Sequence, residues 1–293
     1  MNGPQASWLP DGRRLHLNHG PIDLIVEAFG ETDEVRTAYG QATERFRTIL
    51  GELVEELVEL RRPASPTLRD FVGSTARRME AAVAPLSREF ITPMAAVAGS
   101  VADEMMAAMV AGRRLERAYV NNGGDIALHI APGQQLSVAI AGTGHGLTDR
   151  LTIRADDTVR GIATSGWRGR SFSLGIADAA TVLASSSAAA DAAATLIANA
   201  VDLPGHPAIQ RKAARELAPD SDLGDRLVTT SVGPLAPAEI EMALDAGREV
   251  ADALRRQGSI QTAALYLGGR NRISGTHELA VTGGVTRGVP VHA

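Results

Sequence analysis

Apolar residues recur at every third or fourth position over residues 35–60 of this 293-residue chain. The series comprises Val35, Tyr39, Ala42, Phe46, Ile49, Leu53, Leu57 and Leu60. This spacing forms one apolar stripe on a helix, so the sequence predicts a long amphipathic helix with a buried face. Pro63 and Pro66 follow the series, and proline does not continue a helix, which gives the predicted end.

Four further segments show helical spacing, at 67–84, 94–109, 187–201 and 236–257. The segments 94–109 and 187–201 are rich in small residues. Because small side chains let two helix backbones approach closely, we expect these two helices to pack against each other.

Elsewhere apolar and polar residues alternate with a period of two, which predicts strands. The predicted strands span residues 15–17, 22–29, 117–120, 126–130, 136–141, 151–155, 171–175, 180–183 and 259–267. Helical and strand segments come in blocks rather than in strict alternation, which favours an α+β fold. We expect a mainly antiparallel sheet covered by the long helices 35–60 and 236–257.

The two ends of the chain show little helical or strand periodicity. We interpret residues 1–13 as a flexible N-terminus, residues 14–268 as a single domain and residues 269–293 as a Gly-rich C-terminal tail.

Composition and charge exclude several classes of protein. The formal net charge is −5, whereas general nucleic-acid binding and electrostatic membrane binding both need clustered positive charge. Cysteine is absent, which excludes disulfides, thiolate nucleophiles and Cys-ligated metal centres. The start has no apolar leader pattern, and no run of 18 apolar residues occurs. We therefore expect a cytoplasmic protein with no nucleic-acid partner and no membrane partner.

The familiar catalytic motifs are also missing from the sequence. The seven histidines form no HxxxH or HExxH pair, and neither GxSxG nor GxGxxG occurs. The glycine-rich segment 142–146 opens no predicted helix, so we interpret it as a loop.

A polar Gly-Gly turn lies between two predicted strands, in the order Asn122, Gly123, Gly124 and Asp125. One interpretation is a tight hairpin turn, for which such pairs are a strong signal. The other is a ligand site, because glycine lets a ligand approach the backbone while Asn122 and Asp125 line the rim.

The segment 161–171 combines glycines, hydroxyls, two arginines and a tryptophan. Free backbone amides together with guanidinium groups can hold a phosphate or another anion. The alternative is a solvated hairpin that carries arginines on its surface. The residues that would bind the ligand are Thr164, Ser165, Gly166, Arg168 and Arg170.

Asp191 and Thr195 lie one turn apart in the predicted helix 187–201, among alanines. Aspartate has a poor propensity for helix interiors, so a second role is expected for it. A carboxylate and a hydroxyl suit a hard cation such as Mg²⁺. The alternative is an acid that interacts with the dipole at a helix start.

Four segments together resemble the ApbE-like proteins, and in particular their cytoplasmic branch, the UPF 0280 group. They are residues 90–99, 121–126 and 161–166, and residues 181–184 followed by 188–195, which occur in the family's order. The resemblance covers about residues 14–268 and implies a T-fold-like α+β architecture. It also implies a flavin transferase that binds FAD with Mg²⁺ and moves FMN onto a threonine of a partner protein.

The resemblance further implies a metal site formed by Asp191, Thr195 and the backbone carbonyl of Ala96. The packing of the two small-residue helices is expected to bring Ala96 near Asp191. Two departures from the family stand out: Gly99 replaces a lysine, and residues 167–180 lack the family's His-Ile-x-Asp-Pro-x-Thr-Gly stretch.

These departures leave three functions open. The first is an FMN-transferase-like or diverged enzyme that binds an anionic or phosphorylated ligand such as FAD or FMN. The second is a non-catalytic ligand-binding or assembly protein that serves a partner oxidoreductase. The third is an enzyme acting on a small carboxylated ring compound held by Arg168 and Arg170. General frequency favours a homodimer.

Overall fold

The computed structural model describes residues 3–139, 149–275 and 279–281. These residues form two compact units, each assembled from separate stretches of the chain. The first unit comprises Met1–Leu136, Ile153–Ile162 and Ser185–Asp191. The second unit comprises Ser137–Thr152, Ala163–Ala184 and Ala192–Ala293. The glycine-rich segment 142–146 lies outside the described residues.

The first unit contains an antiparallel sheet whose strands pair in sequence order. They are β1 (Gln5–Trp8), β2 (Leu15–His19), β3 (Ile22–Gly30), β4 (Leu115–Asn122) and β5 (Asp125–Ile130). The strand β8 (Gly161–Ser165) begins in this unit and pairs with β5 through Ile126 and Ile162. Alternate residues such as Leu24 and Val26 are fully buried, as period-two alternation predicts.

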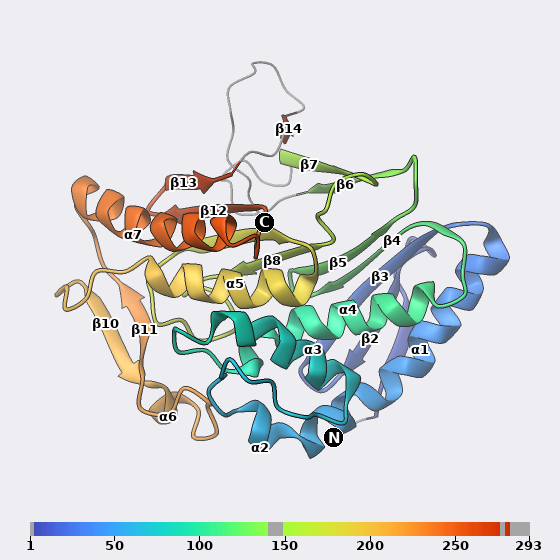
Figure 1. The fold of residues 1–293 in the computed structure, drawn as a ribbon, viewed down its shortest axis with the longest axis horizontal. Helices are drawn as coiled ribbons and strands as arrows, with labels where there is room; N and C mark the ends of the chain where they lie inside the picture. Colours follow the sequence, from blue (N-terminus) through green and yellow to red (C-terminus); the bar gives the residue numbers. More distant parts are fainter. Residues whose placement is uncertain (1–2, 140–148, 276–278, 282–293) are drawn as a thin grey trace. The chain divides into compact units, whose positions relative to one another are not determined.

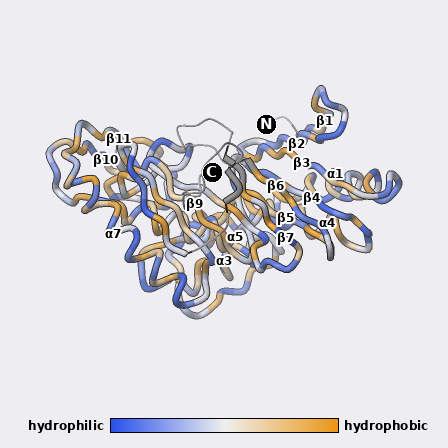
Figure 2. The backbone as a smooth tube through the Cα atoms, turned by 90° about the horizontal axis from the view of Figure 1, so that it is seen from above, coloured by the Kyte–Doolittle hydropathy of each residue, from blue (hydrophilic) through white to orange (hydrophobic). Residues whose placement is uncertain are grey.

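Helices cover one face of this sheet (Figure 1). The helices that contact its strands are α1 (Thr32–Glu55) and α4 (Val97–Val110). The others are α2 (Leu57–Leu60), α3 (Ser74–Val83), and the short η1 (Ala84–Leu86) and η2 (Pro93–Ala96), of which α2 contacts α1 and α3 contacts both α1 and α4. α1 contacts β3 and α4, while α4 contacts β4 and β5. Phe46 and Ile49 of α1 and Met105 of α4 are buried in the shared core. Hydrophobic and hydrophilic residues both occur along α1 (Figure 2).

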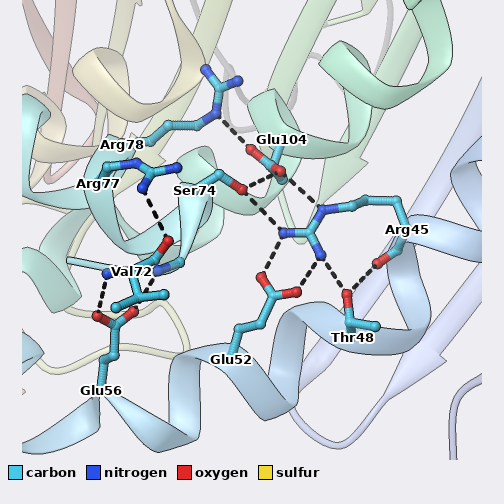
Figure 3. A network of polar contacts seen from close by, with 10 residues as sticks. Arg45, Thr48, Glu52, Glu56, Val72, Ser74, Arg77, Arg78 and Glu104 are labelled. Atoms are coloured by element: carbon cyan, nitrogen blue, oxygen red, sulfur yellow. Dashed lines mark hydrogen bonds and ion pairs between the residues drawn. The ribbon is translucent and has the colours of Figure 1, made fainter.

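A network of charged side chains joins α1, α3 and α4 (Figure 3). Arg45 of α1 donates to Glu104 of α4 at 2.9 Å and forms a two-fold ion pair with Glu52. Glu104 also accepts from Ser74 at 2.6 Å and from Arg78 at 2.8 Å. Burial opposes ionisation of Glu104, but these bonds outweigh it and lower the pKa of its carboxyl group. α4 is therefore fixed relative to two neighbouring helices.

The second unit contains the end of β8 followed by β9 (Ala179–Ala184), β12 (Thr262–Leu267) and β13 (Arg270–Ser274). Its helix α7 (Pro237–Arg256) contacts β12 and β13. The helix α5 (Ser187–Ala200) begins in the first unit and ends in the second. The remaining elements are β6 (Gln135–Ala139), β7 (Asp149–Arg154), β10 (Ile209–Ala213), α6 (Ala214–Leu217), β11 (Leu227–Val232) and β14 (Leu279–Val281).

The predicted α+β class with a largely antiparallel sheet is confirmed. The helices predicted at 35–60, 94–109, 187–201 and 236–257 are all present, the first of them interrupted at Glu56. The helix predicted at 67–84 begins only at Ser74.

The strand predicted at 171–175 is wrong. Asn199 of α5 accepts a hydrogen bond from the amide of Leu174 at 2.9 Å, and the carbonyl of Ser173 accepts from Thr229. Side-chain and loop partners therefore satisfy this backbone, and the segment forms a loop. The strands β8, β10 and β11 had no counterpart among the predicted strands.

Both chain ends contain structure where the sequence suggested none. β1 lies within the N-terminal stretch expected to be flexible and pairs with β2. β13 lies within the expected tail and pairs with β12. Arg272 in β13 binds Asp245 and Glu241 of α7, so tertiary ion pairs hold a segment whose local pattern is weak. The extent of the domain stays a prediction.

Candidate functional site

The Gly-Gly segment is the two-residue turn of the β4–β5 hairpin. Asn122 and Asp125 are paired across it, and both are buried. Gly123 and Gly124 have φ angles of +66° and +116°, a region that glycine enters without the Cβ penalty. The hairpin interpretation is therefore confirmed, and the ligand interpretation depends on what surrounds the turn.

The hairpin turn lies against the first turn of α4. The side-chain amide of Asn122 donates to the carbonyl of Ala98 at 3.0 Å. Ala98 is the second residue of α4, and Ala96 is the last residue of η2, which leads into it. The hairpin turn and the start of α4 are thus in direct contact within the first unit.

Asp191 faces the same helix start. One of its carboxylate oxygens accepts from the amide of Gly99 at 3.0 Å, and the amide of Ala98 also donates to it. The first amides of a helix have no partner inside the helix and carry partial positive charge. Asp191 therefore does interact with a helix start, but with that of α4 rather than that of its own helix.

The carboxyl group of Asp191 is hard to ionise although the residue is partly exposed. Desolvation and the nearby carboxylate of Asp125 raise its pKa well above the ordinary value, while the amides of Gly99 and Ala98 oppose the rise. The carboxyl groups of Asp191 and Asp125 thus lie close together, and the two backbone amides partly stabilise the charged form of Asp191.

A pH-dependent difference in stability follows from this raised pKa. The folded state binds the Asp191 proton more tightly than the unfolded chain does. The free energy of unfolding of the wild type, relative to that of Asp191→Asn, is therefore expected to fall as the pH rises above about 4. Urea unfolding of both proteins between pH 3.5 and 8 measures the difference. A difference that grows with pH would contradict the raised pKa.

The expected packing of the two small-residue helices is confirmed where α5 begins. A Cβ atom on Gly99 would lie 2.3 Å from the carbonyl oxygen of Ser187, and one on Gly161 of β8 would lie 2.1 Å from the Ser187 nitrogen. The start of α5 thus contacts two glycines from different elements. These glycines serve close backbone approach.

Asp103 is the residue of this region that the sequence analysis missed. Its carboxylate oxygens accept from the amides of Ser187 and Ala188, the first two of α5, at 3.0 and 2.8 Å. Burial raises the pKa of Asp103, although these amides and Arg78 oppose the rise. Its position one turn after Gly99, on a helix of small residues, is the signal that could have found it.

In the second unit, the segment after β8 forms a tight loop. The hydroxyls of Thr164 and Thr181 are 3.0 Å apart, which links β8 with β9. A Cβ atom on Gly166 would lie 2.6 Å from the carbonyl oxygen of Asp178. Gly166 therefore has a steric role, and Ser165 beside it is half-buried.

The two arginines of this loop differ in their surroundings. Arg168 forms an ion pair with Asp178 at 2.9 Å and lies over the ring of Trp167. Arg170 is exposed and has no ion pair with any other residue that the structure describes. Arg170 is thus the better placed of the two to bind an anion from solvent.

The predicted site residues belong to both compact units. Those gathered at the start of α4 in the first unit are Ala96, Asn122, Gly123, Gly124, Asp125 and Asp191. Those in the second unit are Thr164, Ser165, Gly166, Arg168, Arg170 and Thr195.

Within residues 3–139, 149–275 and 279–281, no three His, Asp or Glu side chains form a metal-binding group. A cation at Asp191 would thus depend on one carboxylate with carbonyl and hydroxyl oxygens, a set that Mg²⁺ accepts when ligand oxygens and water complete its shell. A hollow of about 650 Å³ in the first unit, lined by Gln134, Arg154 and Arg160 among others, includes none of the predicted site residues.

The part of the chain that the structure describes contains no helix long and apolar enough to cross a membrane.

Comparison with known proteins places the chain in a family. A family model described as AbpE bacteria matches residues 6–273. The chain belongs to this family. The predicted membership of the ApbE-like proteins, UPF0280 group, is thereby confirmed.

Curated relatives of this AbpE member include two archaeal proteins. A UPF0280 protein of Methanothrix thermoacetophila is 42% identical over 113 residues, which are 38% of this chain and 46% of the relative. A UPF0280 protein of Methanococcoides burtonii is 38% identical over 122 residues, 41% of this chain and 50% of the relative. The chain thus spans about half the length of the curated relatives it matches.

Two solved structures are also similar to this AbpE member. The apo flavinyl transferase ApbE of Pseudomonas stutzeri aligns over 94% of this chain and 95% of that chain, with 10% identity and a TM-score of 0.44. A mutant of the flavin transferase ApbE of Vibrio cholerae aligns over 89% and 97%, with 11% identity and a TM-score of 0.40.

Proposed function

We propose that this chain binds a flavin nucleotide, FAD or FMN, together with Mg²⁺ at the start of α4. The observation that carries the proposal is the gathering of Asn122, Asp125 and Asp191 around that helix start. Membership of the family supports it, since the resemblance to flavin transferases implies this class of ligand.

The local charges fit a cation. Asp125 raises the pKa of Asp191, so a positive ion beside the Asp191 carboxylate would offset the repulsion from Asp125. The residues that would hold the ion are Asp191 and the carbonyl of Ala96, with Thr195 proposed from its helical spacing. Mg²⁺ bound there would screen the negative charge of a nucleotide phosphate.

The loop that carries Arg170 supports binding of an anion by the second unit. Arg170→Ala is expected to weaken binding of an anion such as inorganic phosphate to this loop by about 1.5–3 kcal/mol, the value of a hydrogen bond to a charged group. Isothermal titration with inorganic phosphate measures the change. Arg168→Ala is the matched control, because Asp178 already engages that guanidinium. Equal losses in both variants would contradict a specific role for Arg170.

Binding without flavin transfer is the second candidate function, and Gly99 favours it. Gly99 stands where flavin-transferring members carry a lysine, and the carbonyl of Ser187 fills the space a side chain would need. Residues 167–180 also lack the histidine and Asp-Pro of those members. Such a protein would deliver its ligand to a partner oxidoreductase.

A panel of ligands tests the proposed class. Binding of FAD and FMN, with riboflavin at least tenfold weaker, is expected because riboflavin lacks the phosphate that a cation at Asp191 would recognise. Binding of benzoate in preference to all three flavins would instead favour the carboxylated ring compound. Incubation with FAD and a threonine-containing acceptor protein then separates transfer from binding alone.

Three wider expectations stay proposals: a cytoplasmic location, a homodimer, and a partner oxidoreductase. Light scattering of the purified chain tests the dimer directly.

A further inference from the structure

The starts of α4 and α5 hold each other through reciprocal carboxylate contacts. Asp191 on α5 accepts from the amide of Gly99 at the start of α4, at 3.0 Å. Asp103 on α4 accepts from the amides of Ser187 and Ala188 at the start of α5, at 3.0 and 2.8 Å. Each helix thus supplies the acid that satisfies the unpaired first amides of the other.

Asp103 is attached to a rigid part of the first unit. The next residue, Glu104, binds Arg45 of α1 and both Ser74 and Arg78 of α3 (Figure 3). These bonds fix α4 relative to α1 and α3, so the carboxylate of Asp103 is a fixed point against which α5 is placed.

α5 connects this fixed point, at Ser187, with the proposed site at Asp191. Asp191 follows Ser187 by four residues, which is about one helical turn. Anchoring the first amides of α5 therefore sets the rotation of the turn that carries Asp191. Gly99 and Gly161 leave room for the backbone of Ser187 at this position.

We propose that Asp103 is a positioning residue for Asp191. It acts through the first two amides of α5 and directs the Asp191 carboxylate toward the start of α4. As far as ligand binding is concerned, this role rests on the proposed function. The geometric role concerns Asp191 and α4 alone.

Asp103→Asn tests the geometric role, with Glu56→Gln as the matched control. Glu56 accepts from the amides of Val72 and Gly73 at 2.7 and 2.9 Å, just before α3, so it makes the same kind of contact elsewhere in the first unit. Site-resolved hydrogen exchange at the Gly99 amide is the measurement. We expect exchange at least tenfold faster in Asp103→Asn and unchanged in Glu56→Gln.

The second measurement is the affinity for Mn²⁺, used alone as a spectroscopic substitute for Mg²⁺. We expect about tenfold weaker Mn²⁺ binding in Asp103→Asn and wild-type binding in Glu56→Gln. Thermal unfolding of both variants shows how far a general loss of stability contributes. If Asp103→Asn fails to fold, Asp103→Glu keeps the charge and both acceptor oxygens one methylene further out, and we expect the same changes in smaller measure.

The outcomes separate this inference from the proposed function. If Asp103→Asn and Glu56→Gln give the same exchange at Gly99, Asp103 has only a structural role and the inference is overturned. If the wild type binds no Mn²⁺, the proposed metal site fails, and exchange at Gly99 alone decides the positioning role. Fast exchange with unchanged Mn²⁺ affinity would overturn the link to the ligand.

Discussion

Gly99→Ala is expected to lower the free energy of unfolding by about 2 kcal/mol or more, within or above the usual range for overpacking. The added Cβ would lie 2.3 Å from the Ser187 carbonyl oxygen and 2.8 Å from the Ala188 nitrogen. Both neighbours are backbone atoms, so either α4 or the start of α5 must shift. The shift would stretch the bonds of Asp103 and Asp191 at the same time.

Gly51→Ala is the control for this prediction. Gly51 lies in α1 with no atom within 4 Å of an added Cβ, so alanine there is expected to stabilise the helix by about 0.5–1 kcal/mol. Urea unfolding of the two variants measures both effects. If Gly99→Ala is as stable as the wild type, the close packing of α4 and α5 is wrong. The Ser187 carbonyl would then not explain why glycine replaces the family's lysine at this position.

Asp191→Asn is expected to remove the dependence of flavin nucleotide binding on Mg²⁺ while the protein stays folded. Asparagine keeps an oxygen that can accept from Gly99, but it has no charge to hold a cation. Without that charge the cation is lost, so binding with Mg²⁺ should fall to the level seen without it. Titrations with FAD in Mg²⁺ and in EDTA measure both levels.

Asp33→Asn is the matched control, because Asp33 lies exposed in the first turn of α1 and its carboxylate pairs with Arg36 of the same helix. It should leave the Mg²⁺ dependence unchanged. If Asp191→Asn alters neither affinity nor metal dependence and instead lowers stability, Asp191 is an acid that only caps the start of α4.

Long-range periodicity made much of the fold predictable. The stripe from Val35 to Leu60 and the small-residue helices follow from spacing alone, because each must bury one face. β13 was missed because ion pairs from Arg272 to α7 hold it, and no local pattern encodes a partner 27 or more residues away. The strand predicted at 171–175 is wrong for the same reason, because the side chain of the distant Asn199 accepts a hydrogen bond from its backbone.

The sequence singled out most residues of the candidate site, but it did not assign their roles. Glycine pairs and an acid among alanines mark places where function or close packing overrides local preference. The sequence does not say which of the two applies: Gly161 and Gly166 serve packing, and Arg168 is engaged by Asp178. Asp103 was missed because its partners are backbone amides, which nearly every residue carries, so its spacing from Gly99 on a small-residue helix is the signal that marks it.

Titration of the wild-type chain with FAD, followed by flavin fluorescence in Mg²⁺ and then in EDTA, tests the proposed binding site most directly. A cation held at Asp191 beside a nucleotide phosphate predicts saturable binding that Mg²⁺ strengthens at least tenfold, equivalent to about 1.4 kcal/mol. Absence of binding, or equal affinity in Mg²⁺ and EDTA, would contradict a flavin nucleotide site with Mg²⁺ at the start of α4.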